Sequence, residues 1–541
     1  VMRLFRKSVL LMLTVFLVAA LAVSCAPAEQ KPLVWGSLSD IETLNPILSE
    51  SSHETDIMNC IFSTLIKVNE NLEFEPDLLA ELPEISDDGM EYTFKLREGV
   101  KFHDGEELTA EDVKFTYEMK MAEGNAVPSR SMWEKIKDFE IIDPYNFKIT
   151  LNELDVTWLE GWAYSEGMIV PKHIVEEEFE DGGQALTKGG DFSQKPVGSG
   201  PYVFKEWEPD DYIMVESFDG YYKGEPKIKE IIFKVIPDTD TLLAQLKAEE
   251  IDIYNGAQPN QYKELLKMKE DGMAIEVHNY ESFIYMHADF NLRHAALKDK
   301  VVRQALNYAF PKEDFIDTVL DGVGTVAHSC INSINWAFTD DVTKYDYNPE
   351  KAKQILDDAG WKPGDDGVRV KDGVRLSFQL STNSGNKVRE DFCNIAAQEW
   401  EAIGAEVEQK HYEAATLFGD ILDGLKFDII VFGWVSGFDP DCKTLWHSEE
   451  IPDPETGATG QNYVGYVNPE MDRLLDEGLK ETDKEKRKEI YAEVQKIISD
   501  DVPYLFVYFY NSVSAVPADL KNFKPNPTQA NNTWNVWEWS W

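Results

Sequence analysis

Two tryptophans, Trp434 and Trp446, lie in and just after a short loop that is the clearest candidate for ligand chemistry in the sequence. The loop (433–441, GWVSGFDPD) directly follows an apolar run at 428–432, which predicts a buried strand. Open α/β sheets bind ligands beyond the carboxyl ends of such strands, and a tryptophan offers a broad apolar face and an N–H donor. We therefore predict that Trp434 and Trp446 contact a ligand. Four other tryptophans, at or near helical stripes, are predicted to fill the core: Trp133, Trp207, Trp361 and Trp400.

Motifs for catalysis and for metal binding are absent from the sequence. It contains no H-E-x-x-H pair, no G-x-x-x-x-G-K-[ST] phosphate loop and no G-x-S-x-G elbow. Apart from Cys25, the cysteines lie far apart and form no C-x-x-C pair: Cys60, Cys330, Cys393 and Cys442. These four allow three disulfide connectivities or four separate buried thiols. We therefore expect no enzymatic activity, no metal site and no cofactor.

The N-terminal segment has the layout of a bacterial export signal. Three basic residues precede an apolar run at 9–23, which is shorter than the roughly 20 residues that a membrane-spanning helix needs. The run ends at 21–25 (LAVSC), which resembles the lipobox of bacterial lipoproteins. We expect a signal peptide at 1–24 and a linker at 25–30 that carries lipid on Cys25; cleavage and release without lipid is the alternative. The mature protein would then be exported, either lipid-anchored to the outer face of the cell membrane or periplasmic.

Composition favours a globular α/β protein with little affinity for polyanions. The 541 residues include 52 basic and 99 acidic side chains, which gives a formal charge of −47. Such a surface repels phosphate backbones and anionic lipid headgroups, so we expect no nucleic acid partner and membrane contact only through the N-terminal lipid. Strand-like and helix-like segments alternate along the chain. Helices are predicted at 110–123, 299–309, 348–360, 387–403 and 484–499, and strands at 92–96, 229–236, 428–432 and 504–510.

Several longer segments carry a recognisable pattern. They are 75–80 (EPDLLA), 88–97 (DGMEYTFKLR), 100–105 (VKFHDG), 108–113 (LTAEDV), 198–202 (GSGPY), 302–306 (VRQAL) and the stretch 434–446. Together they resemble the extracellular solute-binding proteins of ABC importers, in the family (family 5) that binds peptides, nickel complexes and some oligosaccharides. The resemblance spans almost the whole mature chain.

The resemblance implies a bilobal α/β fold of the periplasmic-binding-protein type (type II, cluster C), with a cleft between the lobes and a small domain inserted in lobe one. The boundaries it implies are 31–58, 196–285 and 506–541 for lobe one, 59–195 for the insert and 286–505 for lobe two. A ligand that touches both lobes can then shift an open form toward a closed one.

The resemblance also implies which residues line the cleft. Glu50, Ser51 and Ser52 correspond to one wall, and Trp434 and Val435 to the opposite wall. The remaining candidates are the rest of the loop and three tyrosines: Ser436, Gly437, Asp439, Trp446, Tyr285, Tyr508 and Tyr510.

One position departs from the pattern of the family. Many dipeptide and oligopeptide binders have an aspartate shortly after the loop tryptophan, and it pairs with the amino terminus of the ligand. Here Ser436, Gly437 and Phe438 occupy that stretch, and Asp439 is the nearest acid. Asp439 would either replace the missing carboxylate or simply form a turn with Pro440.

The function implied by the resemblance is that of an exported, monomeric substrate-binding lipoprotein, which captures peptides and delivers them to the transmembrane subunits of an ABC permease. An oligosaccharide is the first alternative ligand, since tryptophans stack on sugar rings. A nickel complex is a weaker alternative. His53 and His447 are the candidate ligands, but histidines of this kind are more often hydrogen-bonded surface or core residues. A secreted hydrolase, from a different functional class, lacks any motif.

Overall fold

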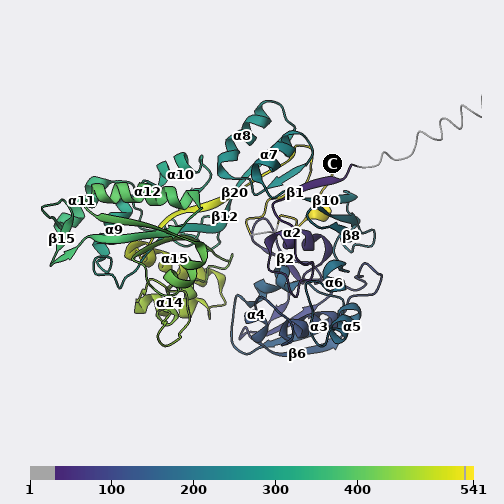
Figure 1. Cartoon of the computed structure of the whole chain (residues 1–541). Coiled ribbons are helices and arrows are strands. Elements are labelled where there is room, and N and C mark those ends of the chain that lie inside the picture. The colour runs from purple at the N-terminus through teal and green to yellow at the C-terminus, as the bar shows by residue number, and fades with distance from the viewer. Residues whose placement is uncertain (1–30, 529–531) are drawn as a thin grey trace, which may run out of the picture.

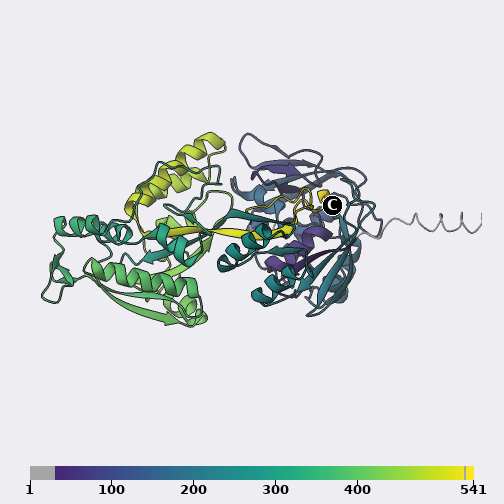
Figure 2. The same cartoon turned by 90° about the horizontal axis from the view of Figure 1, so that it is seen from above.

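The computed structural model describes residues 31–528 and 532–541; the predicted signal segment and Cys25 lie outside the described residues. Two lobes lie side by side, and two long strands, β12 (Ile275–Phe290) and β20 (Tyr504–Pro517), run from one lobe to the other (Figure 1). The view from above shows the same two strands bridging the lobes (Figure 2). The predicted bilobal α/β architecture is confirmed.

One mixed sheet continues through both lobes, in the strand order β18-β17-β19-β12-β20-β11-β1-β10-β9-β8, with β13 attached to β20. The buried apolar runs predicted parallel strands, and β17–β18 and β1–β10 are indeed parallel. However, β12 is antiparallel to both of its neighbours, β19 and β20, so the sheet is mixed. The other strands of this sheet are β1 (Leu33–Ser37), β8 (Tyr202–Glu208), β9 (Tyr212–Ser217), β10 (Glu230–Val235), β11 (Ile253–Asn255), β13 (Thr325–Val326), β17 (Ser377–Asn383), β18 (Glu406–Tyr412) and β19 (Ile429–Val435).

The register between β12 and β20 is interrupted near the middle of both strands, between Glu281 and Tyr285, and it shifts again between Met286 and His287. Before the interruption, residues 275–281 of β12 pair with 511–517 of β20, and this part packs in a lobe-one core with α7 and α8. After it, β12 pairs with both β20 and β19, and this part packs in the core of lobe two. The two strands therefore pass from one lobe to the other at this interruption.

Lobe one carries the insert as a separate body of structure. The insert has a four-stranded antiparallel sheet in the order β4-β5-β7-β6 and its own core, in which Phe94, Phe147 and Trp158 pack together. Its elements, with the adjacent helices and the short strand pair β2–β3, are α2 (Ser52–Ile61), β2 (Ile66–Val68), β3 (Phe74–Pro76), β4 (Glu84–Ile85), β5 (Glu91–Lys95), α3 (Ala110–Met121), α4 (Ser131–Glu134), β6 (Ile136–Asp143), β7 (Asn146–Leu151), η2 (Trp158–Ala163), η3 (Ser165–Gly167), α5 (Lys172–Asp181) and α6 (Asp191–Gln194). The remaining elements of lobe one are α7 (Thr239–Lys247), α8 (Pro259–Glu270) and η6 (Val536–Glu538).

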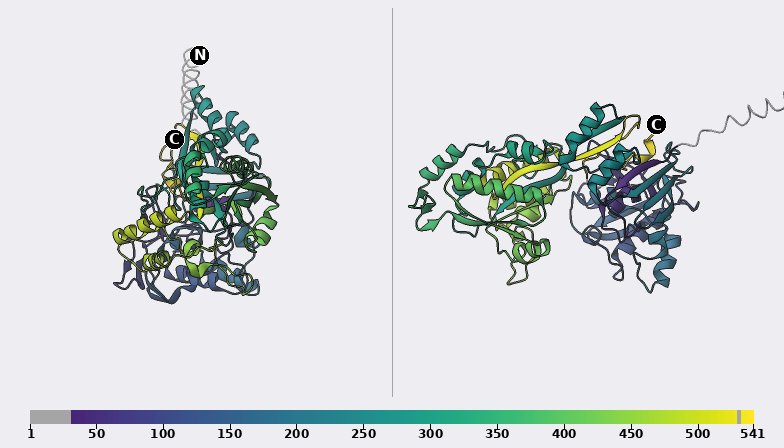
Figure 3. Two further views of the ribbon diagram at one scale, coloured as in Figure 1. Left: turned by 90° about the vertical axis from the view of Figure 1, so that its left-hand side faces the viewer. Right: turned by 45° about the horizontal axis from the view of Figure 1, so that its top comes forward.

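Lobe two packs helices against its half of the sheet, and Figure 3 shows in its right-hand view how this lobe faces lobe one across the bridging strands. Its helices are α9 (Lys300–Tyr308), α10 (Lys312–Val319), α11 (Pro349–Asp358), α12 (Lys387–Ala402), η4 (Thr416–Leu422), α13 (Lys443–Trp446), η5 (Ser448–Glu450), α14 (Pro469–Gly478) and α15 (Lys484–Asp501). A small separate sheet is formed by β14 (Lys362–Pro363), β15 (Arg369–Lys371) and β16 (Val374–Arg375).

The predicted helix starts are confirmed, because side chains satisfy the first free N–H groups. At α3, the Asp112 carboxylate accepts a hydrogen bond from the Thr109 backbone N–H at 2.9 Å. At α11, the Asn348 side chain accepts one from the Lys351 N–H at 2.9 Å, with Pro349 at the first helical position.

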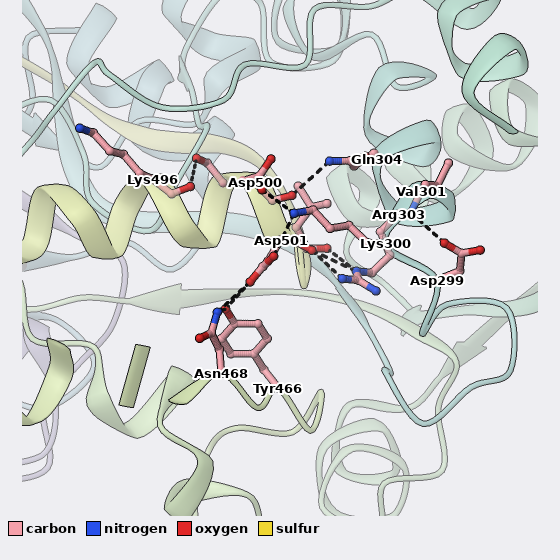
Figure 4. A network of polar contacts seen from close by, with 12 residues as sticks. Asp299, Lys300, Val301, Arg303, Gln304, Tyr466, Asn468, Lys496, Asp500 and Asp501 are labelled. Atoms are coloured by element: carbon pink, nitrogen blue, oxygen red, sulfur yellow. Dashed lines mark hydrogen bonds and ion pairs between the residues drawn. The ribbon is translucent and has the colours of Figure 1, made fainter. Parts of the chain in front are cut away.

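Arg303, from the 302–306 segment, holds the C-terminal end of α15 (Figure 4). Its guanidinium is nearly buried and donates to the carbonyl oxygens of Asp501 at 2.6 Å and Val502 at 3.0 Å, which the helix leaves without partners. The Asp501 carboxylate in turn accepts hydrogen bonds from Lys300 at 3.0 Å and from the Tyr466 hydroxyl at 2.6 Å. This network joins α9, α15 and the 466–468 segment inside lobe two.

Of the tryptophans predicted to fill the core, Trp133, Trp361 and Trp400 are buried. Trp207 is only partly buried, because β8 is the edge strand of the sheet. Its indole N–H donates to Asp40 at 3.1 Å.

Candidate functional site

A cleft runs between the lobes as three adjoining cavities. The main cavity, of about 660 Å³, is lined by the insert (residues between 131 and 166), by lobe one (255–256, 526–528 and 532) and by residues 435–438 at and after the end of β19. It shares Tyr164, Ser165 and Glu166 with a lobe-one cavity of about 400 Å³. On the other side, it shares Phe283 and residues 435–437 with a lobe-two cavity of about 210 Å³. The shared walls make one elongated cleft.

The structure brings most of the predicted site residues to this cleft. Val435, Ser436 and Gly437 line both the main and the lobe-two cavities. The lobe-two cavity also contacts Tyr285, Trp434 and Asp439, and the lobe-one cavity contacts Glu50, Ser51 and Ser52. Ser51 has a second role, because its hydroxyl accepts a hydrogen bond from the His53 N–H at the start of α2.

Trp434 lies between Tyr463 and His287 in a stack of rings within lobe two. Its plane lies within 7° of that of Tyr463 and within 5° of that of His287, at centroid distances of 6.4 and 6.3 Å. His287 stacks in turn on Tyr504 at 4.7 Å. Its Nδ1 lies 2.5 Å from a carboxylate oxygen of Asp289 in the core, where burial raises the pKa of Asp289 although His287 opposes the shift. The stack fixes the orientation of the partly exposed Trp434 ring.

Three predicted residues do not line the cleft. Trp446 is fully buried and packs against Tyr504 at 4.4 Å, so it belongs to the core of lobe two. Tyr508 is also buried there, and Tyr510 packs against it at 4.7 Å. Along β20 the tyrosines at these positions point toward lobe two, because the strand has not yet crossed to lobe one.

Asp439 is committed to a partner within lobe two. Both of its carboxylate oxygens accept hydrogen bonds from Arg487 of α15, at 2.8 and 3.0 Å. One of them also accepts the N–H of Asp441 at 3.0 Å, which is an Asx-type turn. This geometry favours the turn over the amine-binding role for Asp439.

Phe438 crosses the cleft and joins the core of the insert. It is 8% exposed, and its ring meets that of Phe74 edge to face at 5.3 Å. Its carbonyl oxygen accepts a hydrogen bond from the Asn335 side chain at 2.8 Å, which keeps the loop attached to lobe two. The loop after β19 therefore contacts both sides of the cleft.

Glu160 was missed by the sequence analysis. It lies in η2 of the insert and lines the main cavity opposite Gly437. Burial raises its pKa to about 8, and the Asp439 carboxylate adds to that shift. No motif or spacing marks this residue, because the insert reaches the loop only through the tertiary fold.

The end of β19, where Trp434 and Val435 line the cleft, is paired on one edge only. Strand β17 pairs with β19 only at Ile429 and Ile430, while β12 pairs with the whole of β19. Within the described residues, no strand pairs with the second edge of 432–435. An exposed strand edge of this kind can accept an extended peptide as an additional strand.

The described residues provide no obvious metal site and no membrane span. Within 31–528 and 532–541, no group of three or more His, Cys, Asp or Glu side chains is placed to hold a metal ion. In the same ranges, no helix has the length and apolar character needed to cross a membrane.

Comparison with known proteins places the chain in a family. Residues 73–450 match the model for bacterial extracellular solute-binding proteins, family 5. The oligopeptide-binding protein AppA of Bacillus subtilis (strain 168) is 33% identical over 555 residues, which cover 99% of each chain.

Solved structures agree with this assignment. A structure of AppA from Bacillus subtilis in complex with a nonapeptide matches 95% of this chain and 99% of its own, with 33% identity and a TM-score of 0.71. A structure of NikZ from Campylobacter jejuni in complex with Ni(L-His) matches 94% of this chain and 99% of its own, with 30% identity and a TM-score of 0.73. The chain therefore belongs to the bacterial extracellular solute-binding proteins, family 5.

Proposed function

We propose that this protein captures peptides in the cleft between its lobes and delivers them to the transmembrane subunits of an ABC permease. The observation that carries the proposal is the elongated cleft, whose main cavity is lined from both lobes and includes Val435 at the end of β19, where β17 no longer pairs with that strand. Main-chain hydrogen bonds to an extended backbone do not depend on the sequence of the peptide, and roomy cavities accept varied side chains. A binding role, with no bond made or broken, fits the absence of catalytic motifs in the sequence.

Peptide binding is coupled in this proposal to a movement of the lobes. We assign lobe one to 31–58, 196–281 and 511–541, the insert to 59–195, and lobe two to 285–509, with the hinge where β12 and β20 lose register. A ligand that touches both walls stabilises the closed form by its differential affinity for that form. The contact of Phe438 with Phe74 joins the loop of lobe two to the insert, and we expect it to be lost when the lobes separate.

The cleft residues of the proposal are those that line the cavities: Glu50, Ser51, Ser52, Glu160, Tyr285, Trp434, Val435, Ser436 and Gly437. Trp446, Tyr508 and Tyr510 are left out because they pack in the core of lobe two.

Export and attachment of the protein rest on the N-terminal segment. The 21–25 motif supports lipid on Cys25, which would hold a monomeric protein at the outer face of the cell membrane, close to the permease. Metabolic labelling with a palmitate analogue tests this, since Cys25→Ala should abolish the label and a label that persists would disprove the assignment.

A ligand screen separates peptides from the other ligand classes. Binding to the native state raises the melting temperature by mass action. We expect mixtures of short peptides, on a panel of about 10² sequences, to raise the melting temperature. The best peptides would then be studied by calorimetric titration. Stabilisation by oligosaccharides alone, or by Ni(L-His) alone, would contradict the proposal.

A further inference from the structure

The Glu160 carboxyl group lines the main cavity and faces the opposite wall. The backbone N–H groups of Phe438 and Asp439, and the Tyr164 hydroxyl beside it, favour its ionised form and oppose the rise in its pKa. A Cβ placed on Gly437 would lie 3.6 Å from its Oε1, so the loop after β19 passes directly over the carboxyl group. One side chain of the insert thus bridges the cleft at the ligand cavity.

Glu160 has no positively charged partner. Within the described residues, no lysine, arginine or histidine forms an ion pair with Glu160, whereas two acids nearby are paired. Asp439 is neutralised by Arg487 at 2.8 Å, and Lys135 and Asp155 pair with each other. Glu160 therefore remains available to a charge brought by the ligand.

We infer that Glu160 binds a cationic group of the ligand, such as the free amine of a peptide, and couples this charge to closure of the lobes. This inference rests on the proposed function and names the part of the peptide that the cleft recognises. The carboxylate expected at Asp439 from the family pattern would thus be supplied from the opposite wall of the cleft.

The coupling follows from the two sets of contacts that Glu160 makes. An ammonium group in the main cavity favours the ionised carboxylate, because opposite charges attract strongly where water is partly excluded. An ionised carboxylate is a stronger acceptor than the neutral acid for the N–H groups of Phe438 and Asp439. The charged ligand group therefore strengthens the contact between the insert and the loop of lobe two.

Binding should also release a proton. Burial raises the pKa of Glu160 to about 8, with a contribution from Asp439, whereas an ordinary glutamate titrates near 4.5. The other titratable groups that face this wall are Tyr164, Asp439 with its partner Arg487, and Asp441. In the arrangement described here Glu160 is neutral at pH 6.5, so an amine that binds to the carboxylate displaces its proton to the buffer.

The test compares Glu160→Gln with the wild-type protein by calorimetric titration at pH 6.5. The probes are one peptide of the best-binding sequence with a free amino terminus and its N-acetylated form, each titrated in two buffers of different ionisation enthalpy. We expect the wild-type protein to prefer the free amine by roughly tenfold or more and to release close to one proton on binding it. Glu160→Gln should lose both the preference and the proton release and should bind the acetylated peptide as the wild type does.

Glu153→Gln, an exposed position in the same domain that lines none of the described cavities, is the matched control and should behave as wild type. A thermal melt confirms that both variants are folded. If Glu160→Gln keeps the amine preference, or if the wild-type protein releases no proton, the inference is wrong while peptide binding stands. If neither peptide binds the wild-type protein, the proposed function fails and the role of Glu160 fails with it.

Discussion

Arg487 of α15 donates two hydrogen bonds to the Asp439 carboxylate, from Nη1 to Oδ2 at 2.8 Å and from Nη2 to Oδ1 at 3.0 Å. This pair ties the loop after β19 to the longest helix of lobe two, so the wall of the cleft that carries Trp434 is a rigid part of that lobe. The same pair removes Asp439 as a free carboxylate. Another acidic side chain must then bind a positive charge on the ligand, and we infer that this is Glu160 of the insert on the opposite side of the cleft.

Breaking this pair should be costly for stability. The side chains of Arg487 and Asp439 are only 7% and 13% exposed, so Arg487→Met leaves a nearly buried carboxylate without its partner. We expect a loss of about 3–5 kcal/mol in the free energy of unfolding of lobe two, measured by urea denaturation. The control is Arg473→Met, whose ion pairs with Glu470 and Glu477 are exposed and should be worth under about 1 kcal/mol. Equal losses in the two variants would contradict the structural role assigned to the pair.

Substitution of Trp434 should mainly lower ligand affinity, whereas substitution of Trp446 should mainly lower stability, although the sequence suggested the same role for both. Trp434→Ala removes a ring that lines the cleft and should weaken peptide affinity by roughly tenfold or more, with a smaller effect on stability, about 1–2 kcal/mol. Trp446→Ala leaves a cavity in the core and should cost about 3–5 kcal/mol of stability. Calorimetric titration and denaturation of both variants test this. A stability loss for Trp434→Ala as large as that for Trp446→Ala would place Trp434 in the core.

Phe438, which lines the main cavity, should also contribute to affinity through its contact with the insert. Phe438→Ala removes a side chain that only the closed form buries against Phe74, so it weakens closure. Burying a phenylalanine is worth about 1.5–3 kcal/mol, which predicts a loss in affinity of roughly tenfold or more. The exposed Phe418 offers a control, since Phe418→Ala should leave peptide affinity unchanged. Unchanged affinity in Phe438→Ala would argue against a contact specific to the closed form.

Chemical modification of the native cysteines can test whether a ligand occupies the cleft, without any substitution. Cys330 and Cys442 line the lobe-two cavity, and a hydrogen bond from Cys442 lowers the pKa of Cys330. The same interaction raises the pKa of Cys442. Cys60 and Cys393 lie in separate cores, where burial raises the pKa of Cys393 to about 12. Iodoacetamide at pH 7.5 should therefore modify Cys330 before Cys60 or Cys393, because the thiolate is the reactive form.

A bound peptide that fills the lobe-two cavity should slow this alkylation several-fold, as measured by mass spectrometry of tryptic peptides. Modification of Cys60 or Cys393 first, or no protection by a peptide that binds tightly, would show that the ligand does not occupy this cavity.

Individual helices could be predicted well from local signals. The cap at Thr109 and the Asn348-Pro349 start gave the correct beginnings of α3 and α11, because capping depends on residues only three positions apart. The strand predicted at 504–510 was too short, since β20 continues to Pro517 through a mixture of polar and apolar residues that periodicity alone reads as a strand end.

Tertiary relationships could not be predicted in the same way. Trp434 and Trp446 stand in one short segment, yet α13 turns Trp446 into the core while β19 delivers Trp434 to the cleft. Glu160 belongs to an inserted domain far from the loop in sequence, and its role depends on how that domain meets residues 437–439. The family resemblance predicted a cleft between two lobes. The contacts of Trp446 in the core and of Glu160 with residues 437–439 could be seen only in the structure.

Small-angle scattering of the purified protein, with and without saturating peptide, tests the central claim most directly. If the two lobes close over a peptide about the interruption in β12 and β20, the radius of gyration should fall on binding, and the fall should be smaller in Phe438→Ala. Identical scattering curves with and without a peptide that calorimetry shows to be bound would contradict closure, and hydrolysis of the bound peptide would contradict a purely binding role.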